Sequence, residues 1–174
     1  MTTALEFLKS ELWILSWGAS VQRAGLFVEN SSEYARLEFR RAVISFAEHE
    51  ILPKYRSAVA EATHESNIVR LSNRGSELGG SVLLADGYRI GIAQKLLNLQ
   101  LKYLWCLGNI PEPPHCPVDR VMINKTRLKG KVAWTKIKDL NSYQQVIAAL
   151  KEAARPTGLS LAKWEFEAYD RTDA

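Results

Sequence analysis

The sequence has few cysteines and no long apolar run, and each absence excludes a class of protein. Its 174 residues include only Cys106 and Cys116. Two thiols are too few for an iron–sulfur cluster held by four thiolates or for a secreted disulfide scaffold. No uninterrupted apolar segment reaches the roughly 20 residues that a membrane-spanning helix needs, and charged residues interrupt the N-terminus, unlike a signal peptide. We therefore expect a soluble, cytoplasmic protein with reduced thiols and no membrane partner.

Internal repeats and low-complexity segments are also lacking, which argues against a solenoid or a disordered chain. Hydrophobic residues make up 47% of the sequence, enough for one domain of this length to bury a core. Apolar residues recur at helical spacing along much of the chain. We predict an all-α fold, a single-domain helical bundle over residues 1–174.

The N-terminal half is predicted to contain four helical segments. The first covers residues 3–17 and ends at Gly18, with a core face of Leu5, Leu8, Leu12 and Leu15. The second runs from capping residues near Ser32 to Pro53, with a core face of Tyr34, Leu37, Ile44, Ala47 and Ile51. Composition alone favours helices over residues 54–65 and 77–85.

The C-terminal half contains the most apolar helix of the sequence, predicted over residues 92–107. Its pattern places it in the middle of the bundle. Lys95, Asn98 and Lys102 share one face, which can line a cleft. Four prolines between residues 111 and 117 exclude a helix there, and two amphipathic helices are predicted after Asp139 and after Ser160.

Acidic residues are missing from one long segment of an otherwise balanced chain. Residues 1–90 carry 10 Lys/Arg and 11 Asp/Glu, residues 91–138 carry 9 and 2, and residues 139–174 carry 4 and 6. Between Arg120 and Lys138 there are seven basic residues and no acid. A polyanion is a natural partner for such a segment, although a solvated surface gives the same pattern.

Two motifs in the central third resemble the helix-hairpin-helix DNA glycosylase superfamily. They are GIAQKLLNL, which begins at Gly91, and PVDRVMI, which contains Asp119. In this superfamily a glycine hairpin leads into a helix that carries a catalytic lysine, and a Val-Asp-x-x-Val-type segment presents a catalytic aspartate. The resemblance matches Gly91 to a hairpin glycine, Lys95 to the lysine and Asp119 to the aspartate. It implies a helix-hairpin-helix-like central element, with the hairpin and catalytic segment over residues 87–127.

The resemblance implies a DNA glycosylase that flips out a damaged or modified base and cleaves its N-glycosidic bond. The long loop before Asp119 indicates an unusual base, damaged or bulky, the modified bases of viral genomes included. A carboxylate stabilises the positive charge that develops on the sugar, and an amine that attacks the same carbon adds a lyase step. The expected partner is double-stranded DNA, with no cofactor, no metal and no obligatory protein partner. The alternative is a non-catalytic helical module that binds DNA or RNA.

The candidate site residues fall into three groups. The catalytic pair is Asp119 and Lys95. The residues expected to contact DNA are Gly91, Asn98, Lys102, Arg120, Lys125, Arg127, Lys129 and Lys131. The residues expected to line a base pocket are Tyr88, Trp105 and His115. Structural alternatives remain open at this point: Lys95 as an extended surface lysine, Asp119 as a helix N-cap, and His115 with the two cysteines as zinc ligands.

Overall fold

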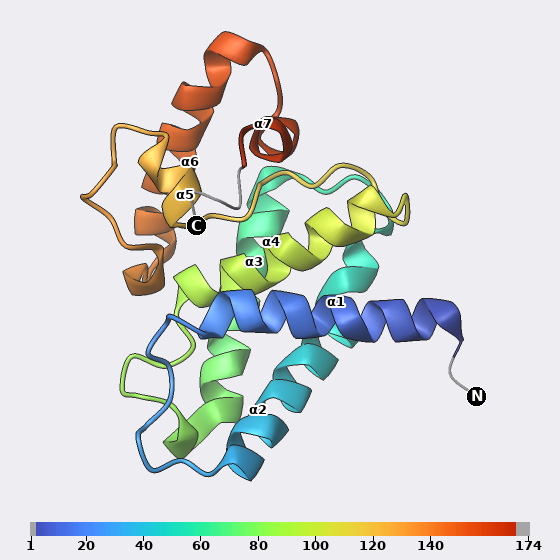
Figure 1. The fold of residues 1–174 in the computed structure, drawn as a ribbon, viewed down its shortest axis with the longest axis vertical. Helices are drawn as coiled ribbons and strands as arrows, with labels where there is room; N and C mark the ends of the chain where they lie inside the picture. Colours follow the sequence, from blue (N-terminus) through green and yellow to red (C-terminus); the bar gives the residue numbers. More distant parts are fainter. Residues whose placement is uncertain (1–2, 170–174) are drawn as a thin grey trace.

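The computed structural model describes residues 3–169, and these form seven α-helices joined by turns and short stretches of 3₁₀ or π-helix (Figure 1). Within this range the β pairing consists of one isolated bridge, between Phe27 and Leu83. The predicted all-α class is therefore confirmed. No helix between residues 3 and 169 has both the length and the apolar character needed to cross a membrane.

Helix α1, Ala4–Val21, is longer than predicted and turns a different face to the core. It continues through Gly18, so the predicted helix end there is wrong. Trp13 and Trp17 pack inward, whereas Leu5 and Leu15 of the predicted core face are 50% and 54% exposed. The large rings, which remove more apolar area from water than leucines do, decide which face is buried.

Helix α2, Glu33–Phe46, begins at the N-cap Ser32 and continues into a π-turn, Ala47–Ile51, and a 3₁₀ turn, Leu52–Arg56. The second predicted helix is thus confirmed over most of its length. Its core residues include Phe39 and Val43. The predicted core residue Tyr34 is 72% exposed.

Helix α3, Glu61–Gly79, overlaps the helices predicted over residues 54–65 and 77–85 only at residues 61–65 and 77–79, so the bounds of both predictions are wrong. Gly75 lies inside α3, where the Tyr88 ring packs against the backbone. A Cβ at Gly75 would lie 2.4 Å from that ring. Gly75 therefore allows α3 and the Tyr88 ring to pack closely, although a glycine in the sequence is usually taken to interrupt a helix.

Helix α4, Ile90–Cys106, occupies the centre of the molecule, as predicted, and packs against α1, α3 and α6 (Figure 1). The proline-rich segment leads from α4 to the short helix α5, Arg120–Asn124. Helices α6, Leu140–Ala154, and α7, Leu161–Ala168, follow and confirm the last two predicted helices. The segments that follow α4 in the chain, including α6, thus pack back against it.

Candidate active site

Lys95 and Asp119 are 24 positions apart in the chain and meet in the structure. The Lys95 Nζ donates to Asp119 Oδ2 over 2.5 Å. The two side chains are only 7% and 12% exposed. Helix α4 supplies Lys95 from its second turn, and the segment before α5 supplies Asp119. The two residues therefore form a largely buried ion pair, and Lys95 is not an extended surface lysine.

Asp119 is also the N-cap of α5, as the structural alternative predicts. Its Oδ1 accepts a hydrogen bond from the backbone N–H of Met122 over 3.0 Å, which leaves Oδ2 for Lys95. A carboxylate is favoured at an N-cap because it satisfies an unpaired amide and faces the positive end of the helix dipole. The fold therefore holds the carboxylate in one orientation.

Gln94, the neighbour of Lys95, fixes the segment that delivers Asp119. Its Nε2 donates to the Val118 carbonyl over 2.8 Å, and its Oε1 accepts from the Val118 N–H over 3.1 Å. The same Nε2 donates to the Gly91 carbonyl over 2.9 Å. These groups are buried, so each bond that is lost leaves an unsatisfied polar atom. Consecutive residues of α4 thus position consecutive residues of the Asp119 segment.

Gln94→Glu is expected to lower the free energy of unfolding by about 2–3 kcal/mol, because a carboxylate oxygen would then face the Gly91 and Val118 carbonyl oxygens without a donor. Urea denaturation followed by circular dichroism measures the change. The control is Gln22→Glu, since Gln22 is exposed at the end of α1. Equal stability of the two variants would show that the Gln94 bonds do not hold the Asp119 segment.

Gly91 brings the basic segment close to α4. A Cβ at this position would lie 1.8 Å from the Trp134 carbonyl oxygen. Trp134 begins a 3₁₀ turn, Trp134–Lys136, and the Lys95 Nζ lies 5.5 Å from its ring centroid. The predicted DNA contact at Gly91 is therefore corrected: this buried glycine allows Trp134 to form a wall beside the ion pair.

The turn before α4 does not present a set of free amides to a phosphate. The N–H of Gly87 donates to the Leu84 carbonyl, and the N–H of Tyr88 donates to Ser76 Oγ. The N–H of Gly91 donates to the Ile137 carbonyl. These three amides are thus bonded within the protein, and the helix-hairpin-helix element is not confirmed.

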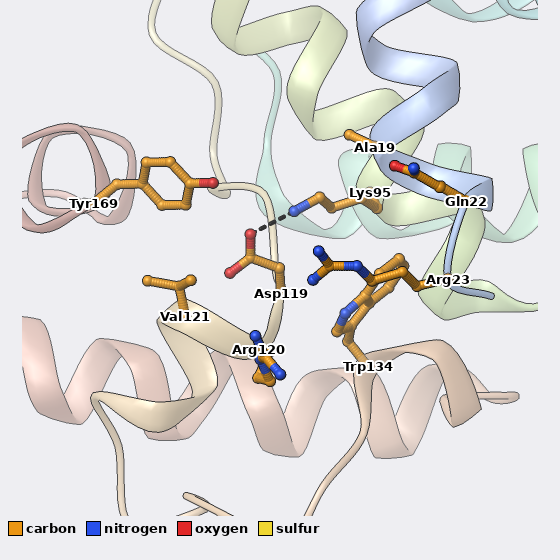
Figure 2. A pocket seen from close by; sticks show the side chains of 9 residues that line it. All are labelled: Ala19, Gln22, Arg23, Lys95, Asp119, Arg120, Val121, Trp134 and Tyr169. Carbon is orange, nitrogen blue, oxygen red and sulfur yellow. Dashed lines mark hydrogen bonds and ion pairs between the residues drawn. The ribbon is translucent and has the colours of Figure 1, made fainter. Parts of the chain in front are cut away.

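A pocket of about 170 Å³ opens over the ion pair. Figure 2 shows the Lys95 ammonium and the Asp119 carboxylate pointing toward each other, with Arg23, Arg120 and the Trp134 ring on one side. Tyr169 lies on the other side of the pair in the same view. Both arginines are exposed. Two guanidinium groups beside the pair make the mouth of the pocket electropositive, which favours an anionic ligand.

The basic residues expected to contact DNA lie mostly on the surface after Asp119. The exposed ones are Arg120, Lys125, Arg127, Lys129 and Lys131. Arg120 lines the pocket over the ion pair, and Arg120 and Lys131 both line an adjoining hollow of about 440 Å³. Arg127 pairs with Glu152 over 3.1 Å. The basic segment therefore reaches the candidate site at one end, through Arg120.

The residues expected to form a base pocket do not line this pocket. Tyr88 is fully buried in the core and stacks on Trp17, with ring centroids 6.5 Å apart. Trp105 is half-buried and packs against Phe166, with ring centroids 6.3 Å apart. The predicted role of these aromatic residues is corrected, because their size and apolar area place them in packing positions.

Asn98 and His115 belong to a buried polar network inside the fold. Asn98 Nδ2 donates to the Tyr143 hydroxyl over 3.3 Å, and His115 Nδ1 lies 2.9 Å from the same oxygen. His115 Nε2 lies 2.9 Å from Glu61 Oε1. Burial lowers the pKa of His115, which favours a neutral ring. The predicted DNA contact at Asn98 and the predicted base contact at His115 are therefore corrected.

One group of side chains within residues 3–169 has the spacing of metal ligands. The carboxylates of Glu61 and Glu65 and the ring of His115 place their ligand atoms within 4.8 Å of one another. The Lys151 Nζ, however, donates to both Glu61 oxygens over 2.5 and 2.7 Å. An ammonium group thus already pairs with the Glu61 carboxylate of this set. Cys116 is buried and is not part of this group.

Sequence reasoning did not assign Arg23, Trp134 and Tyr169, which line the pocket. The sequence does indicate Trp134 as a candidate, because it is the single aromatic residue between Arg120 and Lys138. The sequence around Arg23 gives no such indication, since this residue reaches the site only through the packing of α1 along α4.

Comparisons with protein-family models, with curated proteins and with solved structures each gave no match. The geometry and chemistry of the ion pair and its pocket therefore provide the basis for assigning a function.

Proposed function

We propose that this protein is a DNA glycosylase that cleaves the N-glycosidic bond of a flipped nucleotide, with Asp119 and Lys95 as its catalytic residues. The observation that carries this proposal is the 2.5 Å contact between Lys95 Nζ and Asp119 Oδ2 in a pocket lined by Arg23 and Arg120. The resemblance of the two central motifs to the helix-hairpin-helix glycosylases supports the same assignment. The ligand would be double-stranded DNA with one nucleotide turned out of the stack.

Asp119 would stabilise the charge that develops as the base leaves. The bond between C1′ and the base nitrogen breaks, and the base takes the electron pair. Positive charge then develops on the sugar, where a carboxylate in a site with little water is most effective. In simple hydrolysis a water oxygen bonds to C1′, and its released proton balances the proton that the base takes up. The fixed orientation of Asp119 as an N-cap suits this electrostatic role.

Lys95 would add a covalent route once it has lost a proton. Asp119 Oδ2, at 2.5 Å, is placed to accept that proton. The neutral amine then bonds to C1′ as the base departs with the electron pair of the broken bond and takes up the proton from Asp119, which becomes a carboxylate again. Opening of the sugar ring gives a Schiff base. Elimination then removes a proton from C2′ and forms a double bond between C2′ and C3′, while the bond between C3′ and its phosphate oxygen breaks and the phosphate leaves with the electron pair. Water finally releases Lys95 and a cleaved strand.

The groups around the pair provide the contacts that such a substrate needs. Arg23 and Arg120 stand where the phosphates of the flipped nucleotide would pass. The Trp134 ring offers a flat apolar face beside Lys95. Lys131 extends the cationic surface away from the pocket along the adjoining hollow. Together these groups favour the binding of a DNA strand with one unpaired nucleotide turned toward the ion pair.

A non-catalytic DNA- or RNA-binding module is the second candidate, and one observation favours it. Both oxygens of Asp119 have partners within the fold, since Oδ1 caps α5 and Oδ2 binds Lys95. A pair with this bonding can stabilise the junction of α4 and α5 without any chemistry. Such a module would bind nucleic acid in a salt-dependent manner and release no base.

Borohydride trapping is expected to give a covalent protein–DNA adduct with the native protein and none with Lys95→Gln. Only a Schiff base between an amine and C1′ is reduced to a stable product. The assay uses duplexes with single damaged or modified bases, followed by denaturing gel electrophoresis. The control is Lys163→Gln, which removes an exposed lysine that pairs with Glu112. Base release without an adduct would assign simple hydrolysis, and binding without release from any duplex would assign the binding module.

A further inference from the structure

The pocket over the ion pair is the middle part of a longer groove. On one side it shares Arg23, Arg120 and Trp134 with the hollow that contains Lys131. On the other side it shares Lys95 and Asp119 with a cavity of about 620 Å³ between α1, α4 and α7. The ion pair therefore lies at the boundary between two different environments.

The two ends of the groove differ in their chemistry. The end at Lys131 is lined by Arg23, Arg120 and Lys131 and by further residues of the basic segment, and among the residues that the structure describes no acidic one lines it. The cavity at the other end is lined by three aromatic rings, Tyr103, Phe166 and Tyr169, and by the ion pair of Lys102 and Glu165. Phosphates suit the first end, and a flat heterocycle suits the second.

The Lys102–Glu165 pair is a built feature of the cavity. Glu165 is only 2% exposed and accepts from Lys102 Nζ over 2.7 and 2.9 Å. The same ammonium lies 5.5 Å from the Phe166 ring centroid and 5.3 Å from that of Tyr169. Burial raises the pKa of Glu165, and the Lys102 ammonium partly offsets this by favouring the carboxylate. A fixed donor and a fixed acceptor thus stand together among aromatic rings.

Resting on the proposed glycosylase function, we infer that this cavity is the base pocket and that its substrate is a nucleotide whose base carries a bulky substituent. Lys102 and Glu165 recognise polar groups on the substituted base, and Phe166 stacks against it. Arg23 and Arg120 hold the adjacent phosphates, so that C1′ lies between the two ends, at Lys95 and Asp119.

The size of the cavity supports an enlarged base. A volume of about 620 Å³ lies in the range of sites that hold drug-sized ligands, roughly 300–1,000 Å³. The pocket directly over the ion pair is much smaller, at about 170 Å³. A single unsubstituted ring would leave much of this larger space to water. A bulky substituent fills that space and places its polar groups against the buried pair.

The test compares bases that differ by one bulky substituent. One pair of duplexes carries 5-hydroxymethylcytosine with or without a glucose on its hydroxyl, and a second pair carries guanine with or without an aromatic group at C8. Base release is measured under single-turnover conditions for the native protein and for Phe166→Ala and Glu165→Gln. The control is Tyr34→Ala, because Tyr34 is 72% exposed and does not line the groove.

We expect the native protein to release at least one bulky base more than tenfold faster than its smaller counterpart. Phe166→Ala should reduce that preference by about tenfold to a hundredfold, the usual contribution of one base–aromatic stack. Glu165→Gln should reduce it as well, because the substrate loses a charged acceptor, while Tyr34→Ala should not. Phe166 is 59% exposed, so its removal tests the inference even if Glu165→Gln fails to fold.

Two results separate the inference from the function on which it rests. Release of small damaged bases with no preference for bulk, or an unchanged preference in Phe166→Ala and Glu165→Gln, overturns the inference and leaves the glycosylase proposal standing. Binding of DNA without release of any base overturns both.

Discussion

Asp119→Asn is expected to reduce base release by about a hundredfold to a thousandfold and also to lower the free energy of unfolding, because Lys95 loses its buried counter-charge. Asparagine retains an oxygen that can accept from the Met122 N–H, and it is as good an N-cap as aspartate. It carries no charge, so it cannot offset the positive charge on the sugar, and losses of this size follow removal of one preorganised electrostatic group. The rate is measured by single-turnover release followed by alkaline cleavage of the abasic strand.

Asp139 provides the matched control for this substitution. It caps α6 through its side chain, which accepts from the Ser142 N–H over 2.8 Å, and it lies outside the groove. Asp139→Asn makes the same chemical change at the same kind of helix terminus. It should leave base release unchanged. Native rates in Asp119→Asn would contradict a catalytic role for this carboxylate and would leave only its capping role.

DNA affinity separates the two roles further. Asp119→Asn removes a negative charge next to Lys95 and beside two arginines, so binding to a polyanion should be retained or strengthened. A loss of release with intact binding assigns Asp119 to the chemical step. A parallel loss of both would indicate a collapsed pocket.

The central helix and its lysine could be predicted from sequence because their signal is strong and local. Residues of α4 are apolar on nearly every side, and such a pattern belongs to the centre of a bundle. Lys95 is conspicuous there because a charged residue on a buried helix needs a partner. The motif around Asp119 supplied that partner, and the structure brings the two together over 2.5 Å.

The surroundings of the pair could not be predicted, because they depend on contacts between distant segments. Gln94 holds the backbone of Val118, and nothing in the local sequence of either residue indicates that bond. Arg23 and Glu165 reach the groove through the packing of α1 and α7 around α4. Burial of polar side chains such as Asn98 likewise follows from a partner in α6, Tyr143, and not from helical spacing.

Glycine is an unreliable marker of helix ends in this sequence, and the reason is physical. A glycine weakens a helix by only about 1 kcal/mol, which tertiary packing easily exceeds. Gly18 and Gly75 both lie inside helices in the structure. At Gly80 and Gly87 the chain does turn, and there the backbone adopts positive φ angles of 44° and 63°. Sequence alone does not distinguish a glycine selected for conformation from one selected for close packing.

Gly91→Ala is expected to lower the free energy of unfolding by about 1–2 kcal/mol and to reduce base release with it. The added Cβ would lie 1.8 Å from the Trp134 carbonyl oxygen, a backbone atom that cannot rotate away. Overpacking of this kind costs roughly 1–3 kcal/mol or more, which exceeds the gain of about 1 kcal/mol from alanine in a helix. Relief of the clash moves Trp134 and breaks the bond from the Gly91 N–H to the Ile137 carbonyl.

Gly18→Ala makes the same substitution where no atom lies within 4 Å of the added Cβ. Gly18 is inside α1, so alanine there should raise the free energy of unfolding by about 0.5–1 kcal/mol. We therefore expect urea denaturation to show a lower free energy of unfolding for Gly91→Ala and a higher one for Gly18→Ala, although the chemical change is the same. If Gly91→Ala also stabilised the protein, the Trp134 segment would not pack against α4 as described, and the wall of the active site beside Lys95 would have to be formed by other residues.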